Sequence, residues 1–143
     1  MDGSAVLDTS VIVKWYRQQE VLAGQALALR GAYLDGQIAI AAPSLLVYEL
    51  ANVLRYKRDL TADQVQQAVQ SLFDMGLELL PPSEAVTRRA VELAWAYDTT
   101  VYDATFAALA ESLGAVFLTA DERLARRLQA LPFVRFLGES GGV

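Results

Sequence analysis

The stretch from Thr100 to Asp121 constrains the fold of this chain more than any other part of the sequence. It predicts an amphipathic helix that ends at Gly114, followed by a short, fully apolar strand, Ala115–Leu118. A strand without polar residues is typical of a parallel sheet that helices cover on both faces. The chain is therefore expected to be an α/β protein.

Two carboxylates in this stretch fall where burial is expected. Asp103 shares a helical face with Phe106 and Ala110, and Asp121 lies just beyond the apolar strand. A carboxylate in such a place needs a partner, a cation or a raised pKa. Because the chain has no His and no Cys, and few Lys or Arg are spaced to pair with these acids, the pattern indicates a divalent-metal site.

The rest of the chain repeats the alternation of strand and helix. Apolar runs predict strands at 5–7, 38–41, 77–80 and 133–137, and helices are expected at 11–17, 21–34, 44–57, 61–76, 83–97 and 122–131. Ser10 is expected to cap the first helix. This order predicts a mainly parallel sheet covered on both faces, in one domain with its core at about 5–137 and a frayed tail at 138–143.

Two more acids, one after a strand and one early in a helix, could reach the same edge of the sheet. Asp8 directly follows the first strand, and Glu49 interrupts a helical face that also carries Asn52, Val53 and Tyr56. Ligands of open parallel sheets bind outside the carboxyl ends of the strands. The sequence thus allows four carboxylates to converge on one pocket.

Each of the four acids also has a purely structural interpretation. Asp8 suits a turn after a strand, and Glu49 suits an exposed helix surface. With Thr100, Asp103 forms a helix-capping pattern, and Asp121 suits the N-cap of the last helix. Taken singly, none of these features separates a ligand from a cap.

The polar residues around the acids are equally ambiguous. Ser10 and Thr119 suit caps or turns, and also suit hydroxyls that orient a ligand or hold water. Arg123, Arg126 and Arg127 are expected on a solvated face of the last helix. They also flank an acid, where a phosphodiester backbone would need cations.

Composition limits the classes of function. The 54% of hydrophobic and 20% of charged residues are typical of a globular protein. A net charge of −5 argues against nucleic-acid binding by electrostatics alone, although divalent cations held by carboxylates invert the local charge. The absence of a long apolar run and of a positively charged N-terminal region predicts a cytoplasmic protein without a membrane partner.

Four segments carry a pattern known from one family: Val6–Val11, Pro43–Leu54, Tyr102–Glu111 and Leu118–Leu124. In their order and approximate spacing they resemble the PIN-domain ribonucleases, and most closely the VapC toxins of bacterial and archaeal toxin–antitoxin pairs. The resemblance runs from about residue 5 to residue 137. It implies a three-layer sandwich with a central, mainly parallel sheet of four to five short strands flanked by helices.

The resemblance also implies a function and a site. It implies an acidic pocket that binds Mg²⁺ or Mn²⁺, cleavage of RNA, a homodimer, and a cognate antitoxin protein that covers the site. The family's acids fall on Asp8, Glu49, Asp103 and Asp121, and its auxiliary hydroxyls fall on Ser10 and Thr119. A hard divalent ion held by oxygen ligands activates water and stabilises phosphate charge, so hydrolysis needs no histidine.

Rival functions are weaker. A haloacid-dehalogenase-type phosphatase needs a second Asp two residues after the first, where this chain has Ser10. A receiver domain needs a lysine after a late strand, and none is evident here. The remaining alternative is a PIN-fold interaction module without significant nuclease activity.

Overall fold

The computed structural model describes residues 3–139, in which five parallel strands form one sheet. Its strand order is β3-β2-β1-β4-β5. The strands are β1 (Ser4–Leu7), β2 (Ala39–Pro43), β3 (Glu78–Leu80), β4 (Val116–Thr119) and β5 (Val134–Phe136). The predicted parallel sheet of four to five short strands is confirmed.

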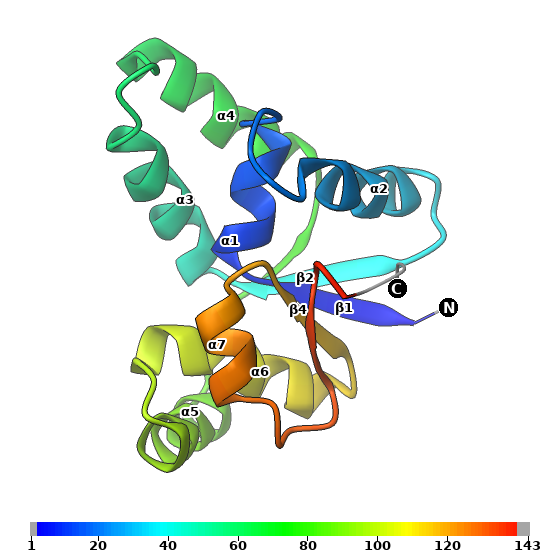
Figure 1. The fold of residues 1–143 in the computed structure, drawn as a ribbon, viewed down its shortest axis with the longest axis vertical. Coiled ribbons are helices and arrows are strands. Elements are labelled where there is room, and N and C mark those ends of the chain that lie inside the picture. Colours follow the sequence, from blue (N-terminus) through cyan, green and yellow to red (C-terminus); the bar gives the residue numbers. More distant parts are fainter. Residues whose placement is uncertain (1–2, 140–143) are drawn as a thin grey trace.

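Helices cover both faces of this sheet (Figure 1). On one face lie α1 (Thr9–Ile12), the 3-10 turn η1 (Val13–Trp15), α2 (Ala23–Leu34), α3 (Leu45–Arg55) and α4 (Ala62–Asp74). On the other lie α5 (Glu84–Tyr97), α6 (Val101–Leu113) and α7 (Glu122–Arg127). The chain builds outward from β1 to β3, then returns to β4 and β5 on the opposite side, so right-handed crossovers place the two groups of helices on opposite faces. This arrangement is the predicted three-layer sandwich.

Small residues let α6 approach the sheet closely. Its buried side is rich in alanine, and the helix packs against β1, β2 and β4. At its end, Gly114 takes a left-handed conformation with φ of 65°, which closes the helix as the sequence predicts. The ring of Phe106 on α6 stacks on that of Phe117 on β4, with centroids 6.5 Å apart. α6 therefore fixes the position of every residue in its first turn relative to the central strands.

Three details of the predicted elements are wrong. The first helix begins at Thr9, so Asp8 takes the N-cap position and Ser10 lies inside the first turn. The last helix ends at Arg127 and not at 131, because the chain turns there toward β5. On α3 the buried face carries Leu46, Leu50 and Leu54, whereas the predicted stripe lies largely in solvent.

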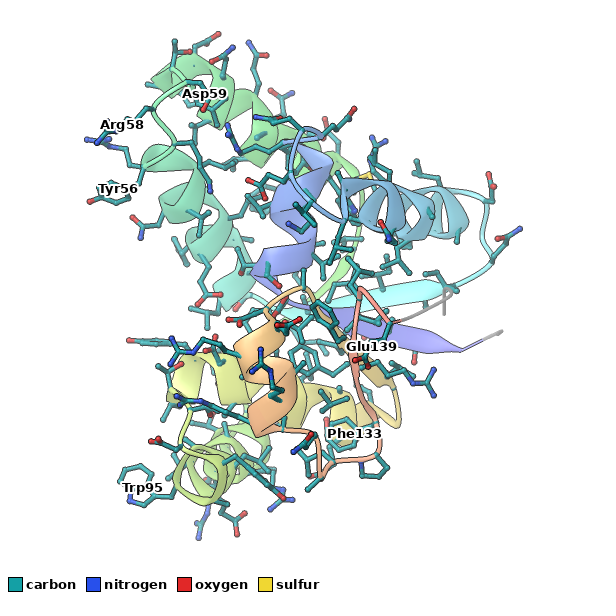
Figure 2. All side chains as sticks on the ribbon, in the orientation of Figure 1. Tyr56, Arg58, Asp59, Trp95, Phe133 and Glu139 are labelled. Carbon is teal, nitrogen blue, oxygen red and sulfur yellow. The ribbon has the colours of Figure 1, made fainter. Side chains whose placement is uncertain are left out.

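α3 packs against α1, η1, α4 and β2, and its outer side lies in solvent. Tyr56 and Arg58 project outward beyond the end of α3 (Figure 2). Trp95 likewise points away from α5 and is 81% exposed. Exposed apolar side chains on the two helices, Tyr48 and Val53 on α3 and Trp95 on α5, are thus available to partners.

No helix among the described residues is long and apolar enough to cross a membrane. Residues 140–143 of the expected C-terminal tail lie outside the described residues.

Candidate metal and active site

The site is built where the order of the sheet reverses. β1 pairs in parallel with β4, and Leu7 lies opposite Leu118. The connections from these two strands lead to opposite faces of the sheet, which leaves a crevice at their carboxyl ends. Asp8 follows β1 and Asp121 follows β4, so both acids stand at this crevice.

Two hydroxyls hold the carboxylate of Asp8. Ser10 Oγ donates to Asp8 Oδ1, and Thr119 Oγ1 donates to Asp8 Oδ2 at 2.6 Å. Ser10 Oγ accepts the N–H of Ala120 at 2.8 Å, and Thr119 Oγ1 accepts the N–H of Asp121 at 3.0 Å. Since the backbone donors occupy a lone pair of each hydroxyl, its single proton is directed at Asp8. The predicted auxiliary hydroxyls therefore orient the acid.

Burial raises the pKa of Asp8 to about 7. The side chain is almost fully buried, and the residue is only 6% exposed. The hydrogen bonds from Ser10 and Thr119 act in the opposite direction, and the negative charge of Asp103 adds to the increase. Within residues 3–139, no Lys or Arg forms an ion pair with Asp8. Asp8 is thus a buried carboxyl group whose negative form lacks a cation.

Glu49 reaches the same region from α3. Thr9 Oγ1 donates to Glu49 Oε1 at 2.7 Å. Burial raises the pKa of Glu49, and the charge of Asp103 raises it further. Thr9 is 8% exposed and was missed as a site residue. The only signal in the sequence is its place between Asp8 and Ser10, in the turn that follows β1.

Asp103 and Asp121 sit at the first turns of their helices. Asp103 lies in the first turn of α6, where its N–H bonds to the capping Thr100 Oγ1 at 3.0 Å. Burial raises the pKa of Asp103, and the negative charge of Asp121 raises it further. Asp121 is the N-cap of α7 and accepts the N–H of Leu124 at 3.1 Å. Its predicted burial is wrong, because the chain leaves the sheet at this residue and the side chain is exposed.

Asp103 connects the four acids electrostatically. Burial is the main cause of the raised pKa of Asp8, Glu49 and Asp103; the charge of Asp103 raises the first two further, and the charge of Asp121 raises that of Asp103 further. In the described part of the chain, however, no three Asp or Glu side chains are placed to coordinate one ion together. The structure thus gathers the four predicted acids at one edge of the sheet and leaves their carboxylates apart.

The donor set nevertheless suits a hydrated hard cation. All four side chains offer oxygen ligands, and Mg²⁺ usually keeps several waters and takes one or two carboxylates from the protein. Asp8 presents a fixed, buried carboxylate that a cation would stabilise as an anion. Asp103 and Asp121 are the acids on the open side of this group, because both line a cavity of about 420 Å³ with Asp98, Arg123 and Arg127.

Comparison with known proteins agrees with this architecture. Residues 5–128 match the family model of the PIN domain. The chain belongs to the PIN-domain family. It is 37% identical over 91 residues to Ribonuclease VapC3 from Pyrobaculum aerophilum, an alignment that covers 61% of this chain and 70% of VapC3.

Solved structures of the family share the fold of this PIN-domain protein. VapC20 from Mycobacterium tuberculosis, a toxin that cleaves the sarcin-ricin loop, superposes with a TM-score of 0.69 at 16% identity, over 91% of this chain and 96% of VapC20. VapBC2 from Rickettsia felis, bound to a promoter DNA fragment, gives a TM-score of 0.67 at 17% identity, over 93% of this chain and 96% of that chain. At these identities the likeness establishes the fold.

Proposed function

We propose that this protein is a divalent-metal-dependent endoribonuclease that hydrolyses RNA phosphodiester bonds, and that it is the toxin of a toxin–antitoxin pair. The observation that carries the proposal is the buried carboxyl of Asp8, which has no cationic partner in the described residues and lies within the electrostatic reach of Asp103. The similarity to Ribonuclease VapC3 supports RNA as the substrate. We further propose that the chain acts as one domain, in the cytoplasm.

Asp8, Asp103 and Asp121 would hold Mg²⁺ or Mn²⁺, directly or through water. The cation would stabilise negative charge on the phosphate oxygens. Ser10 and Thr119 keep the carboxylate of Asp8 in one orientation, so the ligand is in place before the ion arrives. Such preorganisation lowers the cost of binding, because few side-chain rotamers remain to be fixed.

Glu49 is suited to accept a proton from the attacking water. Thr9 occupies its Oε1, which leaves Oε2 free for water. Burial raises the pKa of Glu49 toward the working pH, and a general base acts best when its pKa lies near that pH. Glu49 could alternatively hold a second metal ion.

The decisive experiment compares the wild-type protein with Asp8→Asn. Each is incubated with a structured RNA that contains single-stranded loops, in the presence of Mn²⁺ or Mg²⁺, and cleavage is followed on denaturing gels. We expect the substitution to slow cleavage by roughly 100-fold or more, as loss of an essential site ligand does. EDTA should have a similar effect on the wild-type protein. Equal rates for the two proteins would instead favour a PIN-fold interaction module.

We also propose a cognate antitoxin and a homodimer. The structural relatives include VapBC complexes, which supports an antitoxin partner. An apolar groove of about 590 Å³ lies beside α5 and α6, and its lining includes Leu45, Val101 and Tyr102. Apolar surface of this kind is typical of the buried core of subunit interfaces. Analytical ultracentrifugation tests the dimer, and co-purification with a small protein encoded upstream tests the antitoxin.

A further inference from the structure

The three arginines of α7 have different surroundings, although the sequence presents them as one basic face. Arg126 pairs with Glu122 at 2.6 Å and lines a cavity of about 560 Å³ that is shared with β5. Arg127 donates to the backbone carbonyl of Asp98 and lies 3.6 Å from its carboxylate. Arg127 thereby ties α7 to the end of α5.

Arg123 is not engaged in this way. Across residues 3–139 its guanidinium makes no salt bridge and no side-chain hydrogen bond. It lines the cavity of about 420 Å³ that also contains Asp103 and Asp121. A surface ion pair contributes little energy, so the pair with Glu122 alone does not distinguish Arg126 from Arg123. The two arginines differ in the cavity that they line: Arg123 lines the one with Asp103 and Asp121, and Arg126 lines the one beside β5.

The cavity therefore has two kinds of charge on its walls. Asp103 and Asp121 belong to the proposed metal site, and Arg123 and Arg127 supply positive charge beside them. A protein that binds a phosphodiester chain gains affinity for each phosphate that one of its Lys or Arg side chains neutralises. The planar guanidinium of an arginine fits two phosphate oxygens at once. Since Arg127 already binds Asp98, Arg123 is the arginine of this cavity whose donors are available.

We infer that Arg123 binds the RNA phosphate adjacent to the scissile one and so positions the strand across Asp103 and Asp121. The inference rests on the proposed ribonuclease function and names a contact that sets substrate affinity. Arg123 is a positioning residue, because it would hold a phosphate next to the scissile one and not the reacting phosphate itself. Its contribution should appear in KM and in the salt dependence of RNA binding, with a smaller change in kcat.

The test compares Arg123→Ala with Arg126→Ala, a matched control on the same helix whose side chain faces the other cavity. Steady-state cleavage of a short single-stranded RNA is measured with Mn²⁺, and binding of the same RNA is measured in EDTA by fluorescence anisotropy at several salt concentrations. We expect Arg123→Ala to raise KM by roughly 10-fold, as loss of a charged hydrogen bond does. The slope of log K against log salt should become shallower by about 0.7, which corresponds to one lost phosphate contact.

Arg126→Ala should leave KM and the salt slope unchanged, and Arg123→Lys should restore the slope and only part of KM. Unfolding of all variants is followed in parallel, so a fall in stability cannot imitate a lost contact. Equal values for Arg123→Ala and Arg126→Ala overturn the inference. If the wild-type protein binds RNA without cleaving it, the proposed activity fails, and the salt slopes still decide the role of Arg123. If the wild-type protein neither cleaves RNA with Mn²⁺ nor binds it, both proposals are overturned.

Discussion

The ends of β1 and β4 lie side by side in the sheet, yet the acids that follow them are in opposite states. Asp8, after β1, is buried and its pKa is raised to about 7. Asp121, after β4, is exposed and caps α7 through the N–H of Leu124. One side chain thus carries a charge that the fold disfavours, and the other stabilises a helix.

Thr119 connects the two acids. It is fully buried, donates to Asp8 at 2.6 Å, and accepts the N–H of Asp121 at 3.0 Å. The comparison teaches that neighbouring strand ends need not supply equivalent ligands. In the proposed site, the buried Asp8 would supply a rigid ligand for a cation, and the exposed Asp121 would be the acid that substrate can reach. Four predictions test this difference, from the largest expected effect to the smallest.

The first prediction is that Asp8→Asn stabilises the metal-free protein at high pH. The pKa of Asp8 rises from 3.8 to about 7 on folding. Between these values the folded state keeps a proton that the unfolded state has lost, so stability falls as pH rises from about 4 to about 7. The neutral Asn escapes this penalty, which amounts to up to about 4 kcal/mol above pH 7. The free energy of unfolding in EDTA, measured with urea at pH 4 and pH 8, checks it.

Asp121→Asn is the matched control for that measurement, because its exposed charge carries little burial penalty. The gain for Asp8→Asn should appear at pH 8 and be nearly absent at pH 4. A gain of equal size at both pH values would show that packing, and not charge, is responsible.

The second prediction concerns the cation. Mg²⁺ or Mn²⁺ should raise the melting temperature, since a ligand at 100 times its Kd stabilises the folded state by about 2.7 kcal/mol. The shift should be smaller at pH 5 than at pH 8, because below its pKa of about 7 Asp8 is protonated and must lose its proton to bind the ion. Differential scanning fluorimetry measures both shifts. Asp103→Asn should reduce them, and an unchanged melting temperature at millimolar metal would contradict the site.

The third prediction is that Thr119→Val destabilises the fold by about 1–3 kcal/mol, since the buried carboxylate of Asp8 and the N–H of Asp121 each lose a hydrogen bond. The pKa of Asp8 should rise further, because one of the hydrogen bonds that lowers it is lost. Urea unfolding measures the first effect, and the pH dependence of stability measures the second. Thr105→Val is the control, since the hydroxyl of Thr105 donates only to the carbonyl of Val101 in its own helix.

The fourth prediction separates the two roles of Asp121. Asp121→Ala removes the cap of α7 and should cost about 1 kcal/mol, whereas Asp121→Asn keeps a good capping side chain and should cost almost nothing. Both variants lose the charge, so both should cleave RNA more slowly. Urea unfolding and the cleavage assay distinguish these outcomes. Full activity in Asp121→Asn would assign Asp121 to capping alone.

Local patterns in the sequence were enough to predict most of the fold. Apolar runs defined the strands, and their alternation with helices implied the parallel sheet. The helices predicted to start at 61 and 83 do so, with Thr61 and Ser83 as their N-caps, and the predicted stop at Gly114 is present. These features depend on neighbours within a few residues, which a sequence displays directly.

Tertiary packing decided what the site residues do. The buried face of α3 was predicted wrongly, because which side of a helix is covered depends on elements distant in sequence. The hydrogen bond from Thr9 to Glu49 joins residues 40 positions apart in the sequence, and the hydrogen bond from Thr119 to Asp8 joins residues 111 positions apart. No local pattern in the sequence displays such pairs.

The sequence by itself determined a parallel α/β fold and pointed to four candidate acids: Asp8 and Asp121 after strands, and Glu49 and Asp103 early in helices. Only the tertiary structure decided that Asp8 is buried while Asp121 is exposed, and that Arg123 faces the acids. The physical reason is that desolvation and charge–charge repulsion depend on what surrounds a group in space, and distant segments supply those surroundings.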